Sequence, residues 1–199
     1  AGLFMILALG ESIIITGTLF SRAEITTSTV LAMLAAFVGT ILFWLLYFSH
    51  GAEHGNRFIS RADQTGRIAR LTYTYLHMIL VGGVVLLAVG DDLVLAHPDD
   101  PLDAATNAIV VAAAALYLLG NLLFKRSIGR PWLRSHLLGM AALTALWAVA
   151  PLVPGMTPLV LTWIVNGIVA LVVVIDEYVW PNDEEAEREV QEAADSVEI

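Results

Sequence analysis

The sequence has 199 residues, of which 58% are hydrophobic and only 15% are charged. This composition, with a mean hydropathy of +0.76, excludes an ordinary water-soluble domain and is typical of a membrane protein. The absence of cysteine excludes disulfides and cysteine-ligated metals, and eight acidic residues between positions 181 and 199 contribute most of the net charge of -9.

Six apolar stretches are long enough to cross a bilayer as helices, which requires about 20 residues each. In chain order they are predicted at 2–20, 29–49, 71–90, 104–124, 136–152 and 157–179. Prolines and a glycine between the last two predict a tight turn and a close helical hairpin. No stretch alternates with the period of two that is typical of strands. The predicted fold is therefore an all-α polytopic transmembrane bundle of about six helices, formed by residues 1–180.

Basic residues are distributed unevenly between the loops. Eight of the ten lie in the segments 50–70 and 125–135, whereas the segment "GDDLVLAHPDDPLD" from Gly90 to Asp103 has five aspartates and no basic residue. Because Lys and Arg near span ends are retained preferentially in the cytoplasm, the two basic segments are predicted to face it. We expect a plasma membrane protein with both ends of this chain cytoplasmic, residues 181–199 forming an acidic tail, and the aspartate-rich loop outside.

The first span carries a carboxylate, Glu11, near its middle. At about 100° per residue, Gly10, Glu11 and Gly17 fall on one face of the helix. Glycines permit a neighbouring helix to approach closely, so this face is predicted to pack against other helices with Glu11 towards the interior. An ionised Glu at this depth costs several kcal/mol without a partner. We therefore expect Glu11 to be protonated, hydrogen-bonded, or in contact with water or a cation.

Other polar side chains also lie within the predicted spans. His77 in the third span is a candidate proton partner, and Asn166 lies near the middle of the sixth. Asn107 and Asn121 lie two heptads apart on the fourth. One interpretation is that Glu11, His77 and Asn166 line an ion or proton pathway; the other is that the polar residues only join helices through hydrogen bonds.

Signatures of enzymes are missing from the sequence. It contains no glycine-rich phosphate loop, no G-x-S-x-G motif and no pair of aspartates within the predicted spans. We therefore expect no catalytic activity, no cofactor and no metal site. The expected partners are membrane lipids and other membrane helices, and nucleic acid is not among them.

Three segments resemble the bacterial low temperature requirement A family. They are "GLFMILALGESII" from Gly2, "FWLLYF" from Phe43 and "YTYLHMILVGGVVLLAVGDDLVLAHP" from Tyr73. The resemblance implies a multi-pass membrane protein and marks Glu11, Ser12, Tyr73, Tyr75 and His77 as candidate site residues. Family members are about twice as long, with these segments in the second half. The implied partner is thus a missing N-terminal half of the same protein, or a second copy in a homo-oligomer.

The functional expectation is transport of an ion or small solute, with channel-like use of an intramembrane Glu. The alternative is a non-transporting membrane scaffold or stress-related assembly protein, in which the polar residues form interhelical contacts only.

Overall fold

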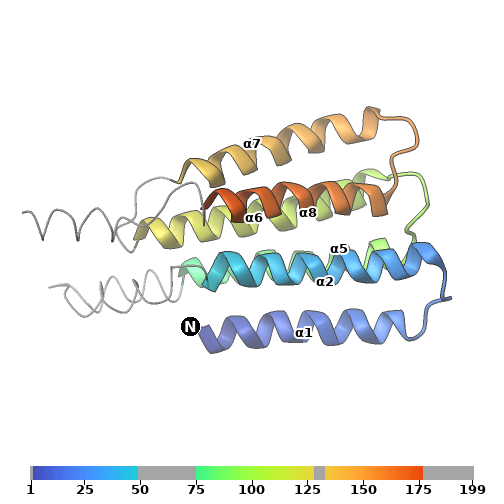
Figure 1. Ribbon diagram of the computed structural model, residues 1–199, viewed down its shortest axis with the longest axis horizontal. Coiled ribbons are helices and arrows are strands. Elements are labelled where there is room, and N and C mark those ends of the chain that lie inside the picture. Colours follow the sequence, from blue (N-terminus) through green and yellow to red (C-terminus); the bar gives the residue numbers. More distant parts are fainter. Residues whose placement is uncertain (1, 49–74, 128–132, 177–199) are drawn as a thin grey trace, which may run out of the picture.

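The computed structural model describes residues 2–48, 75–127 and 133–176. Within these ranges all regular elements are helices, and they lie side by side in one elongated bundle (Figure 1). They are α1 (Gly2–Phe20), α2 (Thr27–Phe48), α5 (His77–Ala96), α6 (Ala104–Ser127), α7 (Arg134–Val149), the short 3-10 helix η2 (Ala150–Leu152) and α8 (Pro158–Val174). In this view α1 and α7 form the two outer sides, and the described loops gather at the end of the bundle opposite Gly2.

Five of these helices are long and apolar enough to cross a membrane. They are α1, α2, α5, α6 and α7 with its η2 extension, each 19 to 24 residues in length. A helix of 20 residues spans about 30 Å, which matches the hydrocarbon core of a bilayer. The sixth, α8, is equally apolar and has 17 residues. The prediction of an all-α polytopic bundle is confirmed.

The third predicted span ends later than the sequence pattern indicated. Position 90 was the expected limit, but α5 continues to Ala96 and takes Asp91 and Asp92 into the helix. The cause is apolar burial beyond the acids, because Val94 and Leu95 both pack into the core. The start of that span, 71–74, lies outside the described residues, as do the predicted acidic tail and most of the two basic segments.

The turn between α7 and α8 was predicted correctly as a tight hairpin. Gly155 adopts a φ of 77°, a left-handed conformation that glycine reaches without steric cost. Thr157 then caps α8, its side-chain oxygen accepting a hydrogen bond from the Val160 amide at 3.3 Å. Two backbone bonds, Leu102 N to Met156 O and Leu159 N to Pro98 O, join this turn to the loop between α5 and α6.

Helices α5 and α6 pack closely together at two glycines. A Cβ added to Gly83 would lie 2.9 Å from the Tyr117 Cβ and 3.0 Å from its Cα. A Cβ added to Gly120 would lie 3.1 Å from the Leu80 backbone nitrogen. Small residues at helix contacts allow this approach in membrane proteins. Tyr117 is therefore held firmly in the bundle core.

Candidate functional site: a polar cavity between α5, α6 and α8

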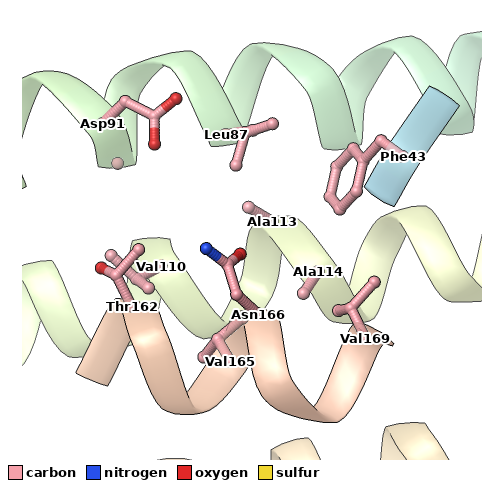
Figure 2. A pocket seen from close by; sticks show the side chains of 11 residues that line it. Phe43, Leu87, Asp91, Val110, Ala113, Ala114, Thr162, Val165, Asn166 and Val169 are labelled. Carbon is pink, nitrogen blue, oxygen red and sulfur yellow. The ribbon is translucent and has the colours of Figure 1, made fainter. Parts of the chain in front are cut away.

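A small cavity lies between α5, α6 and α8, with α2 at one end (Figure 2). It offers about 20 Å³ to the centre of a water-sized molecule, which is room for roughly one water. Most of its wall is apolar, and three polar side chains of the described residues line it: Asp91, Thr162 and Asn166. The apolar lining residues are Phe43, Leu87, Gly90, Val110, Ala113, Ala114, Val165 and Val169.

Asp91 is the ionisable member of this group. Its side chain is only 5% exposed, and its Oδ2 atom has no hydrogen-bond partner among the described residues. A buried carboxylate is strongly destabilised unless it is neutralised or hydrogen-bonded. The sequence reasoning missed Asp91 because "GDD" was assigned to an aspartate-rich loop. The apolar run Leu93–Leu95 after it was the signal that the helix continues.

Asn166 was predicted as a site residue, and the structure places it in this cavity. Its Nδ2 donates to the Ala35 carbonyl of α2 at 2.8 Å. A Cβ added to Gly39 would lie 3.1 Å from the Asn166 Oδ1, so a glycine on α2 accommodates the amide. Asn166 therefore both joins α8 to α2 and presents a polar group at the cavity wall.

Thr162 precedes Asn166 by about one turn of α8. Its Oγ1 donates to the Pro158 carbonyl of the same helix at 2.9 Å. A hydroxyl that donates once keeps its acceptor lone pairs. The three polar groups thus supply oxygen atoms from two helices.

Glu11 does not lie where the sequence reasoning placed it. The side chains that α1 buries are Met5, Leu9, Ser12 and Thr16, whereas Glu11 is exposed. A Cβ at Gly10 or Gly17 would meet nothing within 4 Å. The prediction that this face packs against other helices is therefore wrong for the described chain. Periodicity identified a face of α1 but not which face the other helices cover.

Ser12, next to Glu11, points about 100° away from it around α1 and is buried. Its Oγ has no hydrogen-bond partner within the described ranges, and its carbonyl accepts a bond from Thr16 Oγ1 at 2.9 Å. Ser12 does not line the cavity that contains Asn166. Glu11 and Ser12 are therefore not brought together with Asn166.

The tyrosine and histidine candidates from the third predicted span have different environments. His77 is buried, and its Nε2 lies 2.8 Å from the Tyr47 hydroxyl oxygen of α2. Tyr75 is 57% exposed, and Tyr73 lies outside the described residues. His77 is 14 residues from Asp91 on the same helix, which corresponds to about 21 Å of rise. His77 therefore lies near the opposite end of α5 and does not line the cavity.

A second set of buried polar contacts lies at that end of the bundle. Lys125 in the last turn of α6 is fully buried, and its Nζ lies 2.5 Å from Asp176 Oδ2. The Asn121 amide donates to the Leu46 carbonyl of α2 at 2.9 Å, while its Oδ1 lies 2.9 Å from His136 Nε2 of α7. The sequence reasoning missed the ion pair, because Lys125 was counted with the basic loop residues.

Interhelical bonding by asparagine was predicted, and the structure confirms it. Asn107 Nδ2 donates to the Trp147 carbonyl of α7 at 2.9 Å, and Asn121 and Asn166 each donate to a carbonyl of α2. Each amide satisfies a helix carbonyl across a contact between helices. These bonds join α6 to α7 and both α6 and α8 to α2.

Comparison with known proteins identifies a family and one similar full-length protein. The sequence profile described as "Bacterial low temperature requirement A protein (LtrA)" matches residues 1–174. An uncharacterized protein of Rhizobium meliloti (strain 1021) is 35% identical over 184 residues, which cover 90% of this chain and 43% of that protein. The chain thus spans less than half the length of this relative. No solved structure matches significantly.

Proposed function

The chain belongs to the bacterial low temperature requirement A family of multi-pass membrane proteins, and we propose that it carries an ion or small solute across the plasma membrane. One observation supports this most: a carboxyl group, that of Asp91, is buried in a cavity within apolar helices, and one of its oxygens has no hydrogen-bond partner among the residues that the structure describes. Ionisable groups at membrane depth are expensive and are found chiefly on ion, proton or substrate pathways. On this proposal the chain transports and has no catalytic activity.

The route would continue from the cavity towards the end of the bundle that carries His77. Phe43, which lines the cavity, stacks on Tyr117 with 3.9 Å between ring centroids. The Tyr117 hydroxyl donates to the Phe43 carbonyl at 2.7 Å, which fixes the pair. On this proposal, these two aromatic side chains close the route in the described state. Transport therefore requires this aromatic pair to move.

Glu11 has a separate place in the proposal. It lies in the middle of a membrane-length helix and faces outward, where an ionised carboxylate in lipid is costly. We infer that a further helix covers this face, either from the additional length that the Rhizobium meliloti relative has or from a second copy of the chain. Glu11 then belongs to a contact between helices or to a pathway formed there.

A membrane scaffold is the second candidate function. The observation that favours it is the set of asparagine bonds between helices, because polar side chains used in this way stabilise a bundle without moving any solute. Asn166 fits both functions, since it binds the Ala35 carbonyl and also lines the cavity. Flux distinguishes the two candidates, because a scaffold conducts nothing.

The experiment is flux of protons, Na⁺, K⁺ and small solutes into liposomes that contain the purified protein. Thr162→Val removes a cavity oxygen, and Thr144→Val is its matched control. Both hydroxyls donate to the carbonyl four residues earlier, but Thr144 is exposed. We expect flux of at least one solute above that of empty liposomes, reduced by Thr162→Val and unchanged by Thr144→Val. Folded protein with no flux of any tested solute would favour the scaffold.

A further inference from the structure

Asp91 has an environment that restricts which ion it can bind. The cavity has room for about one water molecule, and Asp91 is the one carboxylate among the described residues that line it. A single negative charge in an apolar wall repels anions and balances one positive charge, so a divalent cation would remain half compensated. The chemistry of the cavity therefore favours a monovalent cation.

The number of oxygen ligands separates a proton from a metal ion. Hard metal cations such as calcium and magnesium take about six or more oxygen ligands. Within the part of the chain that the structure describes, the cavity takes side-chain oxygens from Asp91, Thr162 and Asn166 alone, and its other lining side chains are apolar. A proton requires one covalent bond to a carboxylate oxygen and one acceptor nearby. The Asp91 Oδ2, which lacks a partner among the described residues, can take that proton.

Other charged groups do not share this cavity. On the helices packed around α5, the described ionisable side chains are Glu11 on α1, Tyr47 on α2, Tyr117, Lys125 and Arg126 on α6, and Asp176 at the end of α8. None of them lines the cavity, and Lys125 and Asp176 pair with each other. Asp92, the neighbour of Asp91 on α5, is exposed. No cationic side chain among the described residues is therefore placed to neutralise the Asp91 carboxylate in place of a proton.

We propose that Asp91 is a proton-binding site and that the ion carried through this cavity is the proton. Proton flux through the cavity rests on the proposed transport function, whereas proton binding by Asp91 does not depend on it. In the step itself an O–H bond forms at the Asp91 carboxylate when a proton enters, and the same bond breaks when the proton leaves. No metal, cofactor or second reactant is needed, and the residue returns to its starting state.

Binding is measured without flux by infrared spectroscopy of the full chain in lipid. A protonated buried carboxyl has a C=O stretching band that ionised carboxylates lack. We expect this band at neutral pH in the wild type and in Asp92→Asn, its loss in Asp91→Asn, and its disappearance at alkaline pH. Labelling the wild type with ¹³C-aspartate should shift the band, which assigns it to an aspartate even if Asp91→Asn does not fold. The absence of any band sensitive to the label would overturn the proposal.

Flux is measured in liposomes with a pH-sensitive dye inside, an inward proton gradient and no Na⁺. We expect wild type and Asp92→Asn to acidify the lumen, and Asp91→Asn to lower the rate at least tenfold. Transport of another ion that persists in Asp91→Asn would overturn the proton assignment and leave the transport function standing. The infrared band without flux of any ion would instead support the proton site and contradict transport.

Discussion

The contact between α5 and α6 can be tested with a single methyl group. In Gly83→Ala the new Cβ would lie 2.9 Å from the Tyr117 Cβ and 3.0 Å from both its Cα and its backbone nitrogen. Backbone atoms cannot move aside as a flexible side chain does, so the helices must separate. Overpacking of this kind costs about 1–3 kcal/mol. It would also displace Tyr117, which stacks on Phe43 beside the cavity.

The neighbouring glycine supplies the control. A Cβ at Gly82 would meet only the Leu116 Cδ2, at an ordinary 3.4 Å. Gly82→Ala should therefore keep the usual helix advantage of alanine over glycine, about 0.5–1 kcal/mol. We expect the free energies of unfolding of the two variants to differ by roughly 1.5–4 kcal/mol in detergent titrations. Equal stability of Gly83→Ala and Gly82→Ala would refute the close approach of α5 and α6.

Three further predictions concern the ends of the helices. Lys125→Met leaves Asp176 buried without its cation and should lower the free energy of unfolding by about 3–5 kcal/mol. Arg126→Met, at an exposed position, should change that free energy by less than about 0.5 kcal/mol. Similar values in the two variants would exclude a structural ion pair. Hydrogen bonds from the Thr106 hydroxyl, then from backbone amides, hold the pKa of Asp103 at the start of α6 below its ordinary value of 3.8. The Asp103 cap should therefore stabilise the protein fully above pH 3.8 and lose this effect as the pH falls through the lower folded-state pKa. Asp103→Ala should cost about 0.5–2 kcal/mol at pH 7 and should abolish that pH dependence in thermal unfolding. An unchanged pH profile would contradict the cap. Single cysteines placed in loops 97–103 and 153–157 should react with an impermeant thiol reagent added outside intact cells, and cysteines in segments 50–70 and 125–135 should not; the reverse pattern would invert the proposed orientation.

Much of the fold could be predicted from the sequence because the bilayer imposes a length and a composition on each helix. The six α-helices of the described ranges and the hairpin around Gly155 follow from those constraints and from turn chemistry. The bridging asparagines were also predictable, since a polar amide within a span must find a partner on another helix.

The site was harder to predict than the fold, for two physical reasons. Asp91 follows a run that already satisfies the length of a span, so the pattern assigned it to a loop, but burial of Val94 and Leu95 extends α5 beyond it. The face of α1 that packs is set by the shape of the neighbouring helices. Glycine spacing favoured the Glu11 side, and the structure buries the Ser12 side instead. Neither outcome depends on local sequence alone.

Filling the cavity without removing its charge tests the central claim most directly. A Cβ at Gly90, which lines the cavity, would meet Val110 at an ordinary 3.4 Å, the same nearest distance as at Gly82, which does not line it. Both alanine variants should therefore fold at least as stably as the wild type. Ion flux into liposomes is then compared between them. We predict that flux falls in Gly90→Ala and is unchanged in Gly82→Ala. Equal flux in the two folded variants would contradict transport through this cavity.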